Sequence, residues 1–228
     1  GPNEAPLAGI RATGGELVEP GLAPGPSQIR NSNSYQICAQ LEAAGAAVHY
    51  CGIVPDDEPV MDAVLKHAMS KSDVIILSGG VSMGDFDFVP EVMRNNGMDI
   101  LFDAIAVQPG KPTTFGVGPS VVCFGLPGNP VSTFVQCEVL VKPFLYALMS
   151  HRYQPKMYYL PLAETYRRKK AEREAWVPVA ITPENTVRTS AYHGSAHIHA
   201  LSDADGLVNI PIGVTEIEKG TPVHVRSF

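Results

Sequence analysis

Short runs of apolar residues alternate with longer segments of helical periodicity along the first two thirds of the chain. The short runs predict buried strands at 8–12, 47–54, 74–77, 100–107 and 121–124. In the intervening segments apolar residues recur every three or four positions, which predicts helices at about 31–44, 58–70, 88–95 and 131–149. Strands that alternate with helices at this spacing predict a three-layer α/β/α domain with a mostly parallel sheet.

The pattern changes after His151. Short β-like runs at 158–162, 176–181, 207–210 and 223–226 are separated by turn residues, and no helical periodicity intervenes. This texture predicts a small all-β domain. We therefore expect two domains, an α/β domain over 1–152 and a C-terminal β domain over 153–228.

Charge and composition narrow the choice of partners. The formal net charge of −6 argues against a nucleic acid or an anionic membrane as partner. No apolar run approaches the roughly 18 residues of a membrane span, so no membrane partner is expected. The four cysteines are widely spaced and three of them have apolar neighbours, which is typical of reduced core residues and favours a cytoplasmic location.

The strand predicted at 74–77 ends in a glycine-rich loop that carries carboxylates. Ser78, Gly79 and Gly80 break the strand, and the two glycines allow backbone N–H groups to approach a ligand closely. Gly84 permits a second bend, and Asp85 and Asp87 follow directly. Such a loop is typical of α/β enzyme sites at the carboxyl edge of a sheet. A plain turn with two solvated aspartates remains the alternative.

Two further loops follow predicted strands. Pro109-Gly110-Lys111-Pro112 holds one lysine between prolines. In the segment 126–132, Asn129 suits a helix N-cap, and Ser132 then lies in the first helical turn. A surface lysine and an ordinary helix cap are the alternatives. Because all three loops follow successive strands, we expect them to meet at one sheet edge and bind an oxyanion.

The carboxylates of the first loop suggest a metal. Beside phosphate groups, Asp85, Asp87 and Glu91 would be suited to hold Mg²⁺. Neither the P-loop motif nor the dinucleotide-binding glycine motif is present in the sequence.

Taken together, the loop sequences resemble one known family. The segments 78–87 (SGGVSMGDFD), 109–112 (PGKP) and 126–132 (LPGNPVS), with 29–34 and 52–57, resemble molybdopterin molybdenumtransferase, the MoeA and gephyrin E-domain family. The likeness covers about residues 14–228. It implies insertion of molybdenum from molybdate into adenylylated molybdopterin, with release of AMP and molybdenum cofactor. It also implies Mg²⁺ as cofactor and a homodimeric assembly.

The resemblance also implies roles for individual residues. Asp85, Asp87 and Lys111 would be catalytic, with the two aspartates near the pyrophosphate and Mg²⁺. Lys111 and Ser132 would contact molybdate or phosphate. Asn31, Ser32 and Ser34 would contribute to the pterin–nucleotide pocket, and Arg173 and Ser195 to an oxyanion patch. The other expected substrate-binding residues are Ser78, Gly79, Gly80, Ser82, Gly84, Pro109, Gly110, Pro127, Gly128 and Asn129.

Several features depart from the family pattern. Gly15 stands where a carboxylate is expected, Gln108 where a lysine is usual, and Pro178 where an arginine is often found. Family members also carry two N-terminal domains, so the chain is expected to be a fragment or a short relative. Two alternatives remain open: a non-catalytic module that binds molybdopterin or a partner, and a relative with the same α/β domain that acts on another nucleotide.

Overall fold

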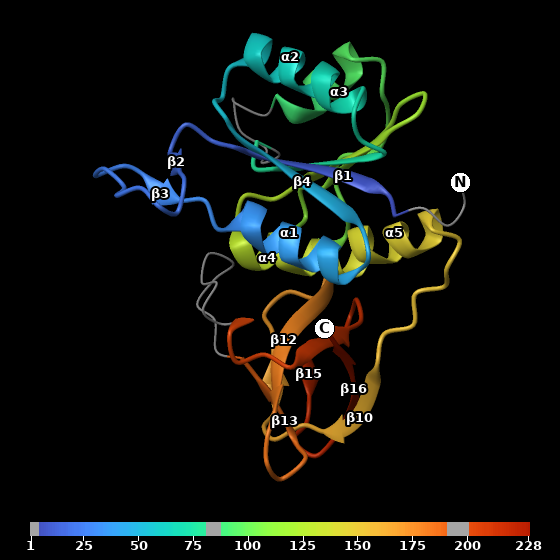
Figure 1. The fold of residues 1–228 in the computed structure, drawn as a ribbon. Coiled ribbons are helices and arrows are strands. Elements are labelled where there is room, and N and C mark those ends of the chain that lie inside the picture. Colours follow the sequence, from blue (N-terminus) through green and yellow to red (C-terminus); the bar gives the residue numbers. More distant parts are fainter. Residues whose placement is uncertain (1–4, 81–87, 191–200) are drawn as a thin grey trace. The chain divides into compact units, whose positions relative to one another are not determined.

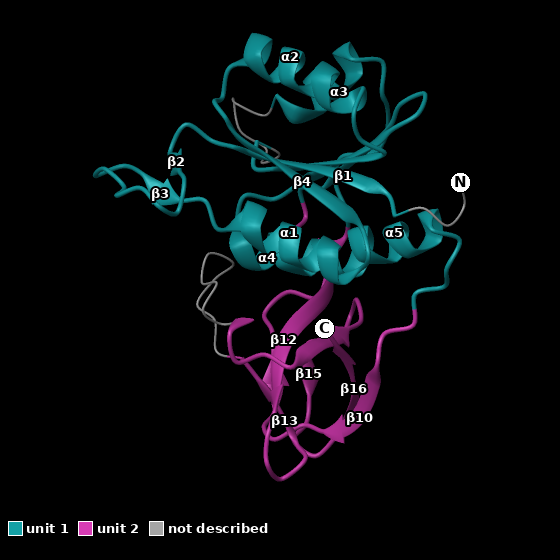
Figure 2. Ribbon diagram, in the orientation of Figure 1, with its two compact units in different colours: residues 1–105, 112–153 teal, residues 106–111, 154–228 magenta. Residues whose placement is uncertain are grey.

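The chain forms two compact units in the computed structural model, which describes residues 5–80, 88–190 and 201–228. The first unit comprises Gly1–Ile105 and Pro112–Tyr153, and the second comprises Ala106–Lys111 and Gln154–Phe228 (Figure 2). Residues 106–111 thus pack with the second unit, although the sequence places them in the first domain. The backbone crosses between the units three times.

A six-stranded sheet forms the centre of the first unit, in the order β4-β1-β5-β9-β8-β6. Four neighbouring strands are parallel: β4 (Ala47–Val54), β1 (Leu7–Thr13), β5 (Val74–Ser78) and β9 (Val122–Leu126). The last two, β8 (Thr114–Val117) and β6 (Asp99–Phe102), run antiparallel to their neighbours. The predicted mostly parallel sheet is confirmed. A short ribbon of β2 (Leu17–Val18) and β3 (Ile29–Arg30) lies outside this sheet.

Helices cover both faces of this sheet and form the three predicted layers (Figure 1). One face carries α1 (Asn33–Ala43), α4 (Pro130–Gln136), a π-helical turn η1 (Cys137–Val141) and α5 (Lys142–Leu148). The other face carries α2 (Glu58–Met69) and α3 (Val89–Asn95). Because β5 lies between the two layers, it is buried along its whole length, which explains its continuous apolar run.

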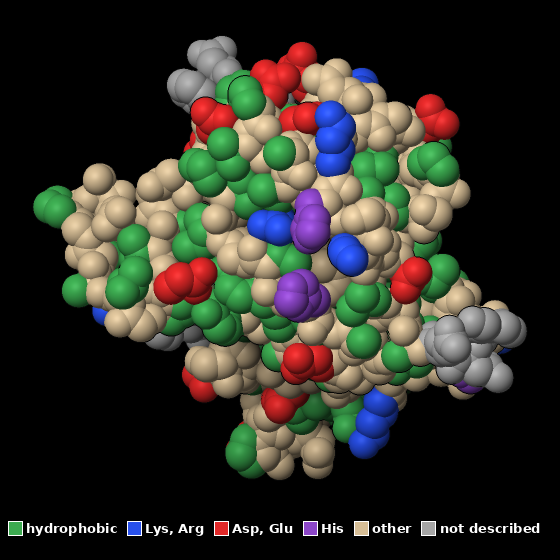
Figure 3. Space-filling view, turned by 45° about the horizontal axis from the view of Figure 1, so that its top comes forward, with side chains coloured by type: hydrophobic (Ala, Val, Ile, Leu, Met, Phe, Trp, Pro, Cys, Tyr) green, Lys and Arg blue, Asp and Glu red, His purple; other side chains and the backbone are tan. Residues whose placement is uncertain are grey.

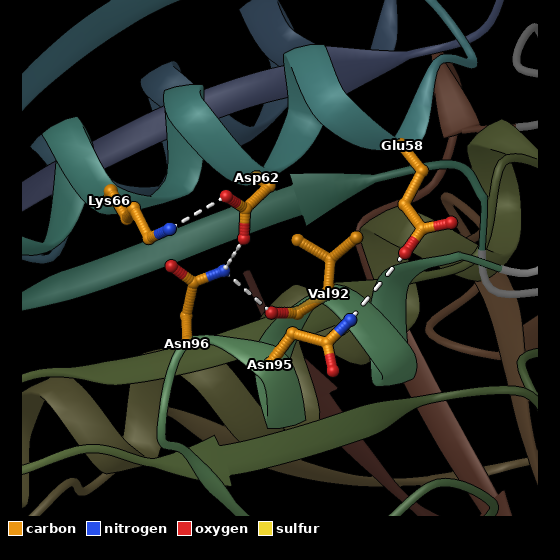
Figure 4. Close-up of polar contacts among 6 residues, drawn as sticks. All are labelled: Glu58, Asp62, Lys66, Val92, Asn95 and Asn96. Carbon is orange, nitrogen blue, oxygen red and sulfur yellow. Dashed lines mark hydrogen bonds and ion pairs between the residues drawn. The ribbon is translucent and has the colours of Figure 1, made fainter.

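Polar side chains join α2 to α3 along their outer side (Figure 4). Asn96 donates from Nδ2 to the Asp62 carboxylate over 2.7 Å and to the Val92 carbonyl over 2.8 Å. Lys66 pairs with the same carboxylate at 2.8 Å. Hydrogen bonds from Lys66 and Asn96 lower the pKa of Asp62. The charged carboxylate thus links the two helices.

The helical stretch from Pro130 to Leu148 is interrupted by the π-turn rather than simply kinked. Pro143 has no N–H to donate, and η1 ends two residues before it. Glu138 of this turn and Lys142, the first residue of α5, form a buried ion pair with an O–N distance of 3.1 Å. The stretch is long and apolar enough to cross a membrane by composition, but 56% of its most apolar window is buried inside the protein, as in a core helix.

The second unit is built on an antiparallel sheet in the order β10-β16-β14-β12-β13. Its strands are β10 (Met157–Pro161), β12 (Glu174–Ile181), β13 (Val187–Thr189), β14 (Gly206–Ile210) and β16 (Pro222–Ser227). A separate pair is formed by β11 (Tyr166–Arg167) and β15 (Glu216–Ile217). The predicted strand-rich C-terminal region is confirmed.

The prediction of one continuous strand over 100–107 is wrong. β6 ends at Phe102, and β7 (Val107–Gln108) pairs in parallel with β12 of the second unit. An apolar run indicates burial but does not say which sheet receives each part of the run. Strand β8 was missed as well, because Gly116 interrupts a four-residue segment with a weak strand signal.

Candidate functional site

Four strands of the first unit end side by side. Thr13 on β1 pairs in register with Val54 on β4, and Ser78 at the end of β5 pairs with both Ala12 and Leu126. The loops that follow these strands therefore emerge along one edge of the parallel sheet. Such an edge is where open α/β sheets place their ligands.

The loop after β5 is held tightly against β1 and β9. Gly79 donates its N–H to the Leu126 carbonyl over 3.0 Å. Its φ is +99°, and a Cβ atom at this position would collide with the carbonyl oxygen of Thr13. Gly80 has a φ of +63°, so both positions favour glycine. The predicted residues Ser82, Gly84, Asp85 and Asp87 lie outside the described residues.

Asn33 joins the loops of this edge to one another. It is the first residue of α1, and its Nδ2 donates to Ser78 Oγ over 3.0 Å and to the Gly128 carbonyl over 2.7 Å. Thr133 Oγ1 lies 3.4 Å from the same nitrogen. Asn33 Oδ1 is buried and has no donor among the residues that the structure describes. One side chain thus fixes the loops after β5 and β9 and the start of α4.

The loop after β9 leads into α4 as the sequence predicts. Asn129 is the N-cap and Pro130 the first helical residue, although the Asn129 side chain does not cap the helix. The single hydroxyl proton of Thr133 is shared between the carbonyls of Pro127 and Asn129, which ties the loop to the first turn of α4. Ser132 lies in the first turn and is 4% exposed. Gly128 passes close to Gly79, since a Cβ atom on Gly128 would lie 3.7 Å from Gly79 Cα.

A second polar cluster surrounds the start of α1. Asn31 is buried, accepts the Ser34 N–H at Oδ1 over 3.2 Å and donates from Nδ2 to the Tyr50 hydroxyl over 2.8 Å. Tyr50 and Tyr35 both donate to the Glu19 carboxylate, at 2.6 and 2.9 Å. Burial, and then the Glu19 bond, raise the pKa of Tyr50. Asn31 and Ser34 therefore support one another, whereas Ser32 is the N-cap without a side-chain cap bond.

The segment that carries Lys111 follows a different strand from the one the sequence predicts. The strand before it, β7, belongs to the sheet of the second unit, so Lys111 does not follow a strand of the parallel sheet. The segment leads instead into β8, whose first residue Thr114 pairs with Gly125 near the end of β9. The antiparallel direction of β8 thus places its start at the carboxyl edge. Pro109 and Gly110 are buried and Lys111 is exposed.

The remaining predicted residues lie elsewhere or cannot be placed. Arg173 is in the second unit, where its Nη1 donates to the Val107 carbonyl over 3.3 Å. Ser195 lies outside the described residues. In the ranges 5–80, 88–190 and 201–228, no group of three His, Cys, Asp or Glu side chains is arranged to hold a metal ion. The proposed Mg²⁺ ligands, Asp85 and Asp87, are not in those ranges.

Sequence reasoning missed three polar residues of this edge: Thr13, Asn33 and Thr133. Thr13 Oγ1 donates to the Ser78 carbonyl over 3.3 Å and so holds the start of the glycine loop against β1. Asn33 lies inside the segment 29–34 that carries the family resemblance. Its position at the start of a predicted helix could have identified it as a site residue. A further contact joins Gly15 N to Asp56 Oδ2 at 3.1 Å, so a carboxylate lies beside the position where the motif lacks one.

Residues 9–147 match the family described as "Probable molybdopterin binding domain". The chain belongs to this family. Residues 161–228 match the MoeA C-terminal region, domain IV. The two matches follow one another along the chain, and they confirm the resemblance to molybdopterin molybdenumtransferase that the loop sequences carry.

Curated relatives and solved structures agree with this molybdopterin-binding family. The chain is 32% identical over 229 residues to molybdopterin molybdenumtransferase of Bacillus subtilis, and 35% identical over 226 residues to that of Synechococcus elongatus. Both alignments cover 96% of this chain but 52% and 55% of the relatives. A crystal structure of the MoeA protein from Pyrococcus horikoshii has a TM-score of 0.86 at 28% identity, over 98% of this chain and 54% of that one. The chain therefore spans about half the length of the relatives it matches.

Proposed function

We propose that this chain carries the molybdopterin-binding and metal-insertion part of a molybdopterin molybdenumtransferase. The reaction would insert molybdenum from molybdate into adenylylated molybdopterin and release AMP and molybdenum cofactor. The observation that carries the proposal is the shared edge of β1, β4, β5 and β9, from which two of the family's loops, those after β5 and β9, emerge. The names of the curated relatives support the same reaction.

The described residues supply groups suited to tetrahedral anions. The N-cap side chain of α4 makes no cap bond, so the N–H groups of its first turn would be suited to an anion, and Ser132 adds a hydroxyl in the same turn. Ser78, Gly79 and Gly80 offer a hydroxyl and closely approachable backbone. Lys111 would add a positive charge that stabilises molybdate or a phosphate group. These groups would orient both oxyanions by hydrogen bonds.

Asn31 and Ser34 would form the wall of the pterin–nucleotide pocket, with Ser32 at its rim. Their mutual hydrogen bonds and the Tyr50 contact hold Asn31 in one orientation. Asn33 would set the distance between the two anion-binding loops rather than contact substrate itself. Arg173 and Ser195 would contribute an oxyanion patch from the C-terminal region.

Asp85 and Asp87 would hold Mg²⁺, which supplies neutralisation of the pyrophosphate charge when it is bound. This part of the proposal rests on the sequence motif. A cytoplasmic location and a homodimeric assembly are expected from the same family resemblance.

Turnover with adenylylated molybdopterin and molybdate tests the function. AMP release by this chain is the expected result. Asp87→Ala and Lys111→Ala should each reduce the rate of AMP release at least tenfold, because each removes a charged side chain that would stabilise the reacting phosphate and molybdate groups. Unchanged turnover in both variants would show that these roles are wrong. Tight pterin binding without AMP release would instead support a non-catalytic binding module.

A further inference from the structure

A cavity of about 580 Å³ lies on the α2 face of the first unit, and Tyr50 is the lining residue that it shares with the candidate functional site. It is lined by residues of β1, β4 and the end of α2, and these are Leu7, Arg11, His49, Tyr50, Cys51, His67, Ala68, Lys71 and Ser72. Cavities of this size commonly hold small ligands. The lining contains two histidines, a lysine and an arginine, and no carboxylate.

This lining is unusual for a chain with 23 acidic and 17 basic residues. Over the described ranges, neither Arg11 nor Lys71 forms an ion pair. Figure 3 shows Lys, Arg and His side chains gathered near the middle of one face of the molecule. Asp73 follows the lining residue Ser72, and its carboxylate accepts the Leu7 N–H over 2.8 Å. Cationic side chains without an ion-pair partner are suited to an anionic ligand.

The arginine provides an independent observation. Arg11 Nη1 donates to the Cys51 carbonyl over 2.8 Å, which fixes the guanidinium beside the cavity. Arg11 Nε is buried and has no acceptor among the residues that the structure describes. A buried donor without an acceptor is costly, and a turn of the guanidinium toward an oxyanion in the cavity would satisfy it.

The absence of a side chain at Gly9 lets Ser72, a lining residue, pack closely against β1. Gly9 on β1 lies beside Ser72, and a Cβ atom on Gly9 would come within 2.7 Å of Ser72 Oγ. Stabilisation of a helix C-terminus is the simplest other role for cations here, since His67 lies in the last turn of α2. That role does not explain Arg11 and His49, which come from strands.

We propose that this cavity is a second anion site, which binds a small phosphate-bearing molecule through Arg11, Lys71, His49 and His67. The proposal does not depend on the proposed function, because none of these four side chains belongs to the candidate functional site. The phosphate oxygens would accept from the guanidinium, the ammonium and the imidazole rings.

The test follows the imidazole signals by NMR, after assignment with His49→Gln and His67→Gln, while inorganic phosphate and then pyrophosphate are added. Both signals should shift together and saturate. Arg11→Gln combined with Lys71→Gln should weaken this binding at least about tenfold, because two charged hydrogen-bond donors are lost. Lys71→Gln alone, at an exposed position, should weaken it by a smaller factor and covers the case in which the double variant does not fold.

Lys66→Gln is the matched control, because Lys66 lies on the same helix but pairs with Asp62 and does not line the cavity. It removes the same net charge and should change the affinity less than about twofold. Equal weakening in Lys66→Gln would overturn the proposal, since only general charge attraction would then be involved. The proposal would also be overturned if the imidazole signals do not shift at roughly 20 mM phosphate. This concentration is well above a dissociation constant of about 1 mM, which corresponds to weak binding.

Discussion

Asn33 is the residue on which the geometry of the candidate functional site most depends. Its Nδ2 donates to Ser78 at the end of β5 and to Gly128 in the loop after β9, about 50 residues further along the chain. Asparagine suits this position because one planar amide group offers two donors and an acceptor. Alanine would leave both loops without this link.

We expect Asn33→Ala to lower the free energy of unfolding by about 1–2 kcal/mol, since two or three partly buried hydrogen bonds are lost. Ligand binding should weaken at least about fivefold because the two loops are no longer held at a fixed distance. Urea unfolding and pterin titration measure the two effects. Asn95→Ala is the control, because Asn95 makes an exposed 3.5 Å contact with Glu58 and should leave ligand affinity unchanged.

Gly79 and Gly52 allow a second comparison at this scale. Both have positive φ, at +99° and +87°, but only at Gly79 would a Cβ atom collide with the backbone. Gly52→Ala should cost about 1–2 kcal/mol from the backbone conformation alone. Gly79→Ala should cost at least about 1 kcal/mol more, because Thr13 must move as well. Equal losses in urea unfolding would contradict the tight packing described for this loop.

Single residues could be predicted where their chemistry is unusual for their position. Ser78, Gly79 and Asn129 were identified because glycines and caps after apolar runs have a defined structural meaning. Asn33 and Thr13 were missed because their partners lie far away in the sequence. Local pattern does not contain such contacts, so these roles became visible only in the fold.

Among the elements, the interrupted helix from α4 through η1 to α5 is the most informative. Its π-turn places Glu138 and Lys142 in the protein interior, where Gln40 Nε2 also donates to the Glu138 carboxylate over 2.9 Å. A buried pair of this kind is held by mutual attraction, and the loss of one partner leaves an uncompensated charge.

Glu138→Ala should therefore lower stability by about 3–5 kcal/mol, as measured by urea unfolding. Glu138→Leu combined with Lys142→Met removes both charges and should recover most of that loss. An exposed pair provides the control, and Arg167→Ala, which breaks the Arg167–Glu216 pair, should cost less than about 1 kcal/mol. A double variant as unstable as Glu138→Ala would show that packing of the π-turn, rather than charge, decides the effect.

Most helices and parallel strands followed from periodicity, because the sheet is buried on both sides and its helices are amphipathic. The run at 100–107 could not be divided correctly, since its two ends enter different sheets. Strand β8 was missed for a related reason, as it is short and antiparallel. The sequence contains the tendency to form strands but not the choice of partner strand.

At the scale of the whole molecule, acidic groups with raised pKa values determine how stability depends on pH. Burial, and then the nearby Glu42, raise the pKa of the Cys38 thiol from 9.0 to about 11. The folded state then keeps a proton that the unfolded state releases above pH 9. Stability is therefore fully present below pH 9 and should fall between about pH 9 and 11. The raised pKa of Tyr50 acts in the same direction at higher pH.

The midpoint of urea unfolding, measured at half-unit steps from pH 8 to 11, checks this expectation. Cys38→Ser removes one of the titrating thiols and should make the decline over this range less steep. The rest of the decline remains, because burial also raises the pKa values of the Cys123 and Cys137 thiols. Asp62→Asn is a useful contrast, because the lowered pKa of Asp62 makes its contribution disappear at acidic pH rather than alkaline pH. A midpoint that stays constant up to pH 11 would contradict the assignment for Cys38.

The pairing of β7 with β12 means that the second unit contains a strand from the middle of the polypeptide. A protease cut between Tyr153 and Gln154 would separate residues 154–228 covalently from the rest of the chain, but β7 would stay paired with β12. We expect such a nicked protein to migrate as one species under native conditions and as two fragments in denaturant. A C-terminal fragment expressed alone would instead expose an orphan strand edge and tend to self-associate.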